Sequence, residues 1–555
     1  MTQKHRVLMV AAENDALPGG KVGGIADVVR HVPMALADLG NEVAVVTPAY
    51  GFLHLLPGAR LRAHTEVAFG PGHHELSTYE VPGRDHHSGV THLVMEGHGL
   101  GTGASAGIYH NDAPERPFAT DATKFSLFCA GVANAAVQGV FGGVDTLHLH
   151  DWHAALILLL VRCDPHFAKL ANLRTVFSIH NLSLQGVRPL GGDPSSLDAW
   201  FPNLEYKKRD VVDPRWPTCI NPMAIGIRLA DAVHTVSPTY AKEILQPSEP
   251  GRPGGEGLEG ELGNAAQDGR LHGILNGCHY PNPKAITGAV ARLITGPIAP
   301  SATIEEAESA QARWQALHRQ ATNAVLGWAA SDATLASEHY IAGERLRVST
   351  NITPELILTS VGRLTSQKVR LLRERMPDGR TIIEHVLDRL GPTGRYVVLG
   401  GGDPEFERAF TQQSAADERL IFLRGYSEAL ANSVYANGDL FLMPSSFEPC
   451  GISQMLAMRS GQPCLVHAVG GLRDTVRHGV DGFWFEGGTA QEQAVNLLTS
   501  LDQALTLRST EPRRWQDIQT AAATARFEWA DAARHYATRL YDATRNAGLE
   551  TRASA

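Results

Sequence analysis

The 555-residue sequence lacks the motifs of several common protein classes. Its six cysteines form no CxxC pair and its 25 histidines form no HExxH pair, so neither a redox dithiol nor a zinc site is predicted. We expect the cysteines to be reduced, because a chain of this size can bury a full core without disulfides. The longest apolar run, from Ala154 to Val161, is far shorter than the roughly 20 residues that span a bilayer.

An excess of positive charge is also missing, because the formal net charge is −9. This balance gives no overall attraction for nucleic acid or an anionic membrane surface, so neither is an expected partner. The first residues, MTQKHRVLMVAAEND, reach acidic positions after a brief apolar stretch, which is typical of a first strand and not of a secretory signal. We therefore expect a cytoplasmic protein, and the sequence leaves its oligomeric state open.

Apolar, β-rich runs alternate with helical patterns along the chain, which is typical of parallel α/β sheets. A helix is expected from Ile25 toward Leu39, where Gly40 ends it. The expected strands of the first half are HRVLMVAA, EVAVVTP, TLHLH, RTVFSIH and AVHTVSP. Those of the second half are LILTSVG, RYVVLGGG, RLIFLRG, DLFLMPS and PCLVHAV. The pattern predicts two Rossmann-like, doubly wound domains.

The domain boundaries follow from the segments between these runs. A first domain is expected over residues 1–277, ending at the GILNG segment, and a second over residues 278–525. The Gly- and Glu-rich stretch from Pro247 to Gly269 indicates a surface loop. Residues 285–353 are rich in Ala, Gln and Glu without a strand pattern, so a helical insertion on the second domain is expected there.

One carboxylate, Glu448, lies on a turn between the apolar run DLFLMP and the helical pattern ISQMLAMRS. Ligands of parallel sheets usually bind at such carboxyl ends of strands. Backbone amides from Gly451 through Ile452 to Ser453 suit a phosphate at the start of the helix. The neighbouring Cys450 is expected to line the site without reacting, since no base is spaced beside it.

A glycine pair, Gly470 and Gly471, follows this helix and would let a second backbone segment approach the same ligand. The whole order, F-E-P-C-G, a short helix, then G-G-L-x-D-T-V, resembles the nucleotide-sugar loop of bacterial glycogen synthases and plant starch synthases. The resemblance covers about residues 5–280 and 355–545.

A basic motif, GRLTSQK, follows the first strand of the second domain. Its Arg363 and Lys368 are two cations of the kind that stabilise a departing nucleoside diphosphate. An exposed basic loop is the alternative interpretation. The motif is similar to the R-L-x-x-Q-K-G of the same family, with Val369 in place of its last glycine, and the absence of Asp-x-Asp fits a metal-independent transferase.

The KVGGIAD segment follows the first strand of the first domain. Its glycines, Gly23 and Gly24, would open a helix, and Lys21 would add an ammonium suited to a diphosphate or a sugar hydroxyl. A tight turn with a surface lysine is the alternative. In the family, the corresponding segment binds the donor, and Lys21 and Asp27 match it.

Histidines lie at the ends of two later expected strands, TLHLH and RTVFSIH, in HLHDWH (His148 to His153) and in the His180-Asn181 pair. Hydrogen bonds to sugar hydroxyls or burial are the favoured interpretations, with a metal as the alternative. The resemblance implies that His180 lies beside the reacting carbon of the sugar. Asp151, Asn181 and Asn276 are also assigned to donor binding. In the second domain, Gly425 and Tyr426 end a strand, where the ring would stack on a nucleobase or be a core tyrosine.

The family has the GT-B architecture, with an active site in the cleft between two Rossmann-like domains and a last helix, here within 526–546, that returns to the first domain. The resemblance therefore implies a retaining transferase that moves glucose from ADP-glucose to the non-reducing end of an α-1,4-glucan. It implies four catalytic residues and no cofactor. These residues are His180, Arg363, Lys368 and Glu448.

Three alternatives stay open at this point. The same fold could use UDP-glucose or another acceptor. A pyridoxal-phosphate-dependent α-glucan phosphorylase shares the architecture, although the sequence shows no lysine motif typical of that cofactor. A non-catalytic glucan-binding protein would have no need of the full charged set.

Overall fold

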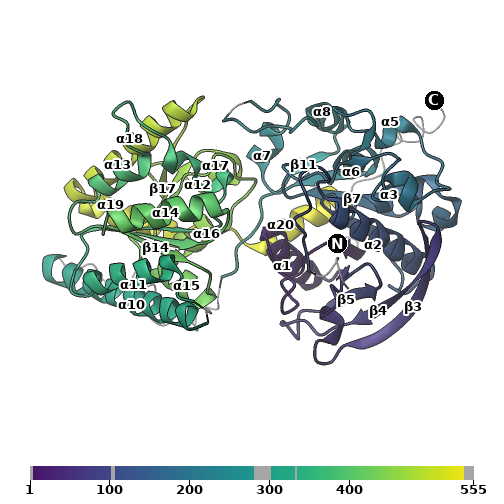
Figure 1. Cartoon of the computed structure of the whole chain (residues 1–555), viewed down its shortest axis with the longest axis horizontal. Helices are drawn as coiled ribbons and strands as arrows, with labels where there is room; N and C mark the ends of the chain where they lie inside the picture. The colour runs from purple at the N-terminus through teal and green to yellow at the C-terminus, as the bar shows by residue number, and fades with distance from the viewer. Residues whose placement is uncertain (1–3, 102–106, 250, 281–301, 332–333, 543–555) are drawn as a thin grey trace. The chain divides into compact units, whose positions relative to one another are not determined.

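The computed structural model describes residues 4–101, 107–249, 251–280, 302–331 and 334–542, with side chains left out for 302–309. It divides into two compact units (Figure 1). Unit 1 comprises Met1–Ser248, Gly254–His279 and Glu528–Ala555, and unit 2 comprises Glu249–Pro253 and Tyr280–Phe527. The main crossings of the chain therefore lie two residues beyond each of the boundaries expected from the sequence, at 279/280 and 527/528.

Unit 1 is built on a nine-stranded sheet with the order β11-β10-β7-β6-β1-β2-β5-β4-β3. All neighbours from β11 to β5 are parallel, and β5, β4 and β3 form an antiparallel meander at one edge. The strands are β1 (Arg6–Val10), β2 (Glu42–Pro48), β3 (Arg60–Phe69), β4 (Gly72–Glu80), β5 (Val90–Gly97), β6 (Thr146–His150), β7 (Arg174–Ile179), β10 (Ala232–Thr235) and β11 (Leu271–Gly273), with a separate pair, β8 (Arg188–Pro189) and β9 (Cys219–Ile220). All five strands expected for the first half are confirmed, whereas β3, β4, β5 and β11 were not predicted.

The helices of unit 1 follow the parallel strands. The first is α1 (Gly24–Asp38), as expected, and Gly40 takes the positive φ of 87° that ends it. The others are α2 (Ala119–Val137), α3 (Leu156–Cys163), α4 (Leu197–Trp200), α5 (Lys208–Val211), α6 (Pro222–Leu229), α7 (Pro238–Glu243), α8 (Glu259–Gln267) and the short turns η1 (Leu53–Leu55) and η3 (Pro165–Leu170). The surface loop expected up to Gly269 was wrong for α8, which forms because Leu262 and Ala265 are buried.

The C-terminal segment belongs to unit 1. It forms α20 (Trp529–His535) and the π-helical turn η5 (Tyr536–Tyr541), and α20 lies beside α1 (Figure 1). Trp529, Tyr536 and Leu540 enter one apolar core with strand residues such as Val7 and Met9. The last residues of the stretch expected as a helix, 543–546, lie outside the described residues.

Unit 2 is built on a six-stranded, fully parallel sheet with the order β14-β13-β12-β15-β16-β17. The strands are β12 (Ile357–Val361), β13 (Arg395–Gly400), β14 (Leu420–Arg424), β15 (Leu440–Met443), β16 (Cys464–His467) and β17 (Gly482–Phe485). The helices are α12 (Ser366–Arg373), α13 (Ile382–Arg389), α14 (Pro404–Ala416), α15 (Glu428–Asn437), α16 (Ser453–Arg459), α17 (Gly470–Thr475), α18 (Ala490–Thr510) and α19 (Pro512–Thr524). The five expected strands are confirmed, and β17 was not predicted.

Two further helices, α10 (Ala302–Ser331) and α11 (Ser337–Ser349), fall in the stretch expected as a helical insertion. They are not peripheral, because Trp314, Leu317 and Val325 pack in one core with the strand residues Ile357 and Val397. The pair therefore forms part of the layer on one face of the sheet. Residues 285–301 of the expected insertion lie outside the described residues.

Within the described ranges, every helix is too short or too polar to cross a membrane.

Candidate active site

In unit 2, the residues predicted for the site follow the carboxyl ends of neighbouring strands. Lys368 lies in the first turn of α12, after β12, and Glu448 follows β15, which pairs with β12. The Lys368 ammonium donates a hydrogen bond to Glu448 Oε2. The structure therefore joins two residues that lie 80 positions apart in the sequence.

The Lys368–Glu448 pair is largely withdrawn from solvent. The Glu448 side chain is 7% exposed and that of Lys368 is 22% exposed. Glu448 Oε2 also accepts a hydrogen bond of 3.2 Å from Ser445 Oγ, whereas Oε1 accepts none from the described residues. A buried carboxylate needs such compensation. One oxygen is thus held by the protein, and the other can accept a hydrogen bond from a ligand.

The two loops that carry the pair are also docked through backbone groups. Gln367 Nε2 donates to the carbonyl of Phe447 at 2.9 Å, and the amide of Ser446 donates to the carbonyl of Gln367 at 2.9 Å. These bonds fix the loop after β15 against the start of α12. The ion pair therefore sits on a rigid frame.

The glycine pair at the start of α17 contacts this same loop. A Cβ on Gly470, which has a φ of +45°, would lie 1.9 Å from the carbonyl oxygen of Glu448. A Cβ on Gly471 would lie 2.3 Å from the carbonyl oxygen of Cys450, and its amide donates to the Glu448 carbonyl at 3.1 Å. The sequence predicts that Gly470 and Gly471 let the backbone approach a ligand. In the structure, the backbone that approaches them is the Glu448 loop itself.

Replacing Gly471 by alanine is therefore expected to displace the loop, because rigid backbone atoms of Cys450 occupy the space of the new methyl group. A shift of about 1 Å in a catalytic group can cost about 10²-fold in rate, and we expect a loss of that order in catalysis. The matched control is Gly343→Ala in α11, where a Cβ meets nothing within 4 Å. Steady-state kinetics of both variants measure the difference, and equal rates would contradict the close-packed loop.

The phosphate-binding segment predicted after Glu448 is held by one side chain. Gln454 Nε2 donates to the carbonyls of Cys450 and Gly451, at 3.2 and 2.9 Å, and to Thr475 Oγ1 at 3.2 Å. Gly451 adopts a φ of +74°, and Ile452 is the N-cap residue of α16, which begins at Ser453. Cys450 is buried and not in a disulfide.

Two other residues of the GRLTSQKV segment, Arg363 and Val369, differ in their exposure to solvent. Arg363 is exposed and forms no ion pair with the described residues. Val369 is buried in the core of the unit, and its amide bonds to the carbonyl of Thr365 at 3.0 Å. The residue in place of the family glycine thus continues α12, which begins at Ser366.

At the end of β14, Gly425 and Tyr426 lie beside α10. Gly425 has a φ of +145°, and a Cβ there would lie 2.8 Å from the Trp328 ring. The Tyr426 side chain is 66% exposed, so the core-tyrosine interpretation was wrong. An exposed ring at a strand end is available for stacking on a planar ligand.

In unit 1, the helix N-terminus predicted to bind a ligand already holds an internal anion. The amides of Val22 and Gly23 both donate to Glu13 Oε2 at 2.6 Å, and Tyr109 Oη donates to Glu13 Oε1 at 2.7 Å. Glu13 is buried and follows β1. The sequence interpretation missed it, although an acidic residue directly after a buried strand was a visible signal. A diphosphate would have to compete with this carboxylate.

The remaining residues of this segment form an ion pair. The Lys21 ammonium donates to Asp27 Oδ1 at 2.5 Å and lies 4.0 Å from Asp15 Oδ2. Burial raises the pKa of Asp27, and Lys21 lowers it. Gly24 opens α1, and a Cβ there would meet nothing within 4 Å. The Lys21 side chain is 39% exposed, so this ion pair lies at the surface of unit 1.

The predicted histidine cluster forms one buried network at the ends of β6 and β7. His180 Nε2 lies 2.9 Å from His150 Nδ1. The His148 ring stacks on His150, with the centroids 4.4 Å apart, and its nitrogens bond to Tyr541 Oη and Ser178 Oγ at 2.8 and 2.6 Å. Throughout the described ranges, no three His, Cys, Asp or Glu side chains are arranged to hold a metal ion.

The carboxylate of Asp151 positions the His180 backbone. Its Oδ1 accepts a hydrogen bond of 2.7 Å from the His180 amide. Burial raises the pKa of Asp151 to about 7, while bonds from the amides of His180 and Asn181 lower it. The Asn181 side chain accepts from the Ser183 amide at 2.9 Å in a local turn. Asn276 is buried, and its Oδ1 has no protein partner in the described structure.

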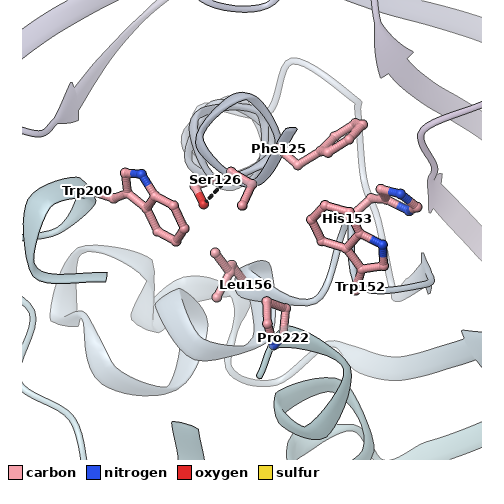
Figure 2. Close-up of a pocket in the computed structure, with 8 residues that line it drawn as sticks. Phe125, Ser126, Trp152, His153, Leu156, Trp200 and Pro222 are labelled. Atoms are coloured by element: carbon pink, nitrogen blue, oxygen red, sulfur yellow. Dashed lines mark hydrogen bonds between the residues drawn. The ribbon is translucent and has the colours of Figure 1, made fainter. Parts of the chain in front are cut away.

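The residues that follow Asp151 line a small cavity, which Figure 2 shows. Trp152 and His153 form one wall together with Phe125 of α2, and Trp200 lies at the opposite wall. With a volume of about 10 Å³ the cavity has space for roughly one water molecule. It is too small for a nucleotide or a sugar, so it is a packing cavity and not a ligand site.

The buried histidines make unit 1 sensitive to acid. Burial lowers the pKa of these side chains: to about 3 for His148, His153 and His180, and to about 4 for His31 and His92. In the unfolded chain they titrate near pH 6.5, so the unfolded state binds more protons below that pH. The stability that these groups contribute is present above pH 6.5 and is lost as the pH falls toward 3. Asp151 acts in the opposite direction, between its ordinary pKa near 4 and about 7.

We therefore expect the urea midpoint of unit 1 to fall as the pH is lowered from 7.5 to 5. The midpoint of unit 2 should change less, since His467 is the single histidine with a lowered pKa among its described residues. Hydrogen exchange of amides in β6 and β13, followed through urea unfolding at each pH, separates the two units. If the urea midpoint of the β6 amides does not change with pH, the histidines of unit 1 are not buried in their neutral form.

Comparison with known proteins places these features in a family. A family profile described as the starch synthase catalytic domain matches residues 6–264, and one described as glycosyl transferases group 1 matches residues 355–503. The chain is 33% identical to the glycogen synthase of Gloeobacter violaceus over 549 residues, covering 96% of this chain and 97% of that protein. It is 33% identical to the glycogen synthase of Deinococcus radiodurans over 544 residues, covering 96% and 98%.

A solved structure shows the same fold. The catalytic domain of starch synthase IV from Arabidopsis thaliana, bound to ADP and acarbose, is 23% identical and covers 97% of this chain and 99% of its own, with a TM-score of 0.71. The two parallel α/β units are thus the doubly wound domains of the GT-B architecture. From the sequence identity over nearly its whole length, the chain belongs to the glycogen synthase family.

Proposed function

We propose that this protein is a cytoplasmic, retaining glycosyltransferase that moves glucose from ADP-glucose to the non-reducing end of an α-1,4-glucan. The family membership supports the reaction class. The starch synthase structure contains ADP and acarbose, which supports an adenine nucleotide and a glucan as ligands here. The acidic net charge of −9 supports neither nucleic acid nor an anionic membrane as a partner.

The observation that carries the proposal is the Lys368–Glu448 pair. Lysine has three N–H donors, so Lys368 can keep its bond to Glu448 and still donate to a diphosphate. Glu448 Oε1 can accept from a sugar hydroxyl, because it accepts no bond from the described residues. One pair of side chains thus offers a cation for the leaving group and an acceptor for the sugar.

The other predicted residues take complementary roles. Exposed Arg363 adds a second cation for the diphosphate, which removes the need for a metal to neutralise the developing charge. Tyr426 stacks on the base, and the amides of Gly451, Ile452 and Ser453 contact phosphate oxygens. His180 orients the donor sugar, and Lys21 with Asp27 adds polar contacts. As the diphosphate leaves, the anomeric carbon becomes oxocarbenium-like, and attack on the same face retains its configuration.

A donor panel tests this proposal. Purified protein is mixed with ADP-, UDP- or GDP-glucose, with and without glycogen, and the released nucleotide is measured. We expect release from ADP-glucose that depends on glycogen, and a much lower rate with the other donors. A preference for UDP-glucose, or release independent of glycogen, would support the related transferases left open by the sequence. No release from any donor would support a glucan-binding protein.

A further inference from the structure

A second histidine, His150, lies directly behind His180. Its Nδ1 is 2.9 Å from His180 Nε2, and the two rings stack with centroids 5.2 Å apart. His150 is fully buried, and its Nε2 has no hydrogen-bond partner in the described structure. The His148 ring covers another side of His150 at 4.4 Å. His150 is thus held tightly, with one nitrogen bonded and the other orphaned.

The orphaned nitrogen determines where the protons lie. Both rings are neutral at pH 7, because burial lowers their pKa values, and a neutral imidazole carries one N–H. If His180 donated to His150, the proton of His150 would be on its buried Nε2, where no acceptor is present. If His150 Nδ1 donates to His180, the orphaned atom is only an acceptor. Buried donors without a partner are rarer than under-satisfied acceptors, so the second arrangement is favoured.

The favoured arrangement also determines which nitrogen of His180 carries the proton. With Nε2 accepting from His150, the proton of His180 must be on Nδ1, which makes no hydrogen bond with the described residues. The backbone of His180 is fixed independently, by the 2.7 Å bond from its amide to Asp151. Its side chain is partly exposed, unlike that of His150. The Nδ1–H group is therefore presented as a fixed hydrogen-bond donor.

We propose that His150 is a positioning residue that sets the tautomer of His180, so that His180 donates from Nδ1 to an oxygen of the bound sugar. The inference rests on the proposed function for the identity of that oxygen, but not for the tautomer. The role of His150 is to keep an N–H, and not a lone pair, directed at the substrate. No proton is transferred in this step, and His150 does not touch the substrate.

The first test needs no substrate. Long-range ¹H–¹⁵N correlation spectra of the protein labelled with ¹⁵N-histidine report which ring nitrogen carries the proton, and His180→Asn assigns the signals. We expect His180 protonated on Nδ1 and His150 protonated on Nδ1. A His180 proton on Nε2 would overturn the inference, whatever reaction the protein catalyses.

Three variants then test the consequence. His150→Asn keeps an amide donor near the position of Nδ1, His150→Gln moves it toward the position of Nε2, and His150→Phe keeps a ring without a donor. We expect His150→Phe and His150→Gln to lower kcat by about 10- to 100-fold with a small change in KM for ADP-glucose, as loss of a supporting partner commonly does. His150→Asn should recover most of the rate.

The outcomes separate the two proposals. Equal kcat for the Asn and Phe variants, both folded by circular dichroism, would overturn the positioning role. If His150→Phe fails to fold, the comparison of the Asn and Gln variants and the wild-type spectra still decide it. An inactive wild type with the Nδ1 tautomer would instead contradict the proposed function and leave the tautomer assignment intact.

Discussion

Replacing Glu448 by alanine is expected to lower glucosyl transfer by about 10²- to 10³-fold, the usual cost of removing one preorganised group that stabilises the transition state. The variant removes both the acceptor at Oε1 and the partner of the Lys368 ammonium. Lys368 can then turn to solvent, because its side chain is 22% exposed, so we expect the fold to persist. Initial rates with ADP-glucose and glycogen, together with the urea midpoint, measure both effects.

A matched control is available in the same unit. Glu405 forms an ion pair with Arg373 of α12 at 2.5 Å, but its side chain is 66% exposed. Glu405→Ala removes the carboxylate partner of a cation on α12 without removing either member of the Lys368–Glu448 pair, and should change the rate less than about twofold. Near-normal transfer by the Glu448 variant would contradict its assigned role. If Glu448→Ala instead lowers the urea midpoint strongly but leaves the transfer rate unchanged, the Lys368–Glu448 pair stabilises the fold and has no role in catalysis.

Replacing Tyr536 by alanine is expected to destabilise unit 1 by about 3–5 kcal/mol, the range measured for deleting a large buried ring. Its side chain is fully buried in the core that the C-terminal segment shares with β1 and α1. The ring also lies 4.7 Å from His234 and 5.6 Å from His148, so the cavity would open beside the histidine network. The shift in the urea midpoint of β1 and β6 amides, followed by hydrogen exchange, measures the loss.

Tyr340→Ala is the control for this experiment, because the Tyr340 side chain is 59% exposed on α11. Tyr536→Phe keeps the ring and should retain most of the stability. If Tyr536→Ala leaves the exchange of β1 and β6 unchanged, the C-terminal segment is not an integral part of unit 1. A loss confined to unit 2 would contradict the division of the chain.

The strands that the sequence predicted are the ones buried on both faces. Continuous apolar runs such as those of β1 and β15, bounded by polar and turn-forming residues, are typical of buried parallel strands, so the sequence alone locates them. The meander from β3 to β5 was missed because β3 is the edge strand and because β3 and β4 are rich in His, Glu and Arg. Alternate residues from Thr65 to Phe69 are buried, and this alternation was the signal available.

The sequence predicts which residues belong to the site, but it does not predict which of them contact each other. Motif spacing identified Lys368 and Glu448, yet their pairing depends on β12 and β15 being neighbours in the sheet, which the chain order does not specify. The same limit explains the glycine pair, since the sequence indicates that a backbone comes close to Gly471 without indicating which one. Glu13 was missed because its partners, two amides and Tyr109, come from separate segments.

The configuration of the product tests the central claim most directly. A short α-1,4-glucan acceptor is extended with ADP-glucose, and the new anomeric signal is followed by ¹H NMR from the first turnover. We expect a new α-1,4 linkage at the non-reducing end, formed about 10²- to 10³-fold more slowly with Glu448→Ala than with wild-type protein. A β linkage, a free glucose product, or formation of the linkage at the wild-type rate by the Glu448 variant would contradict it.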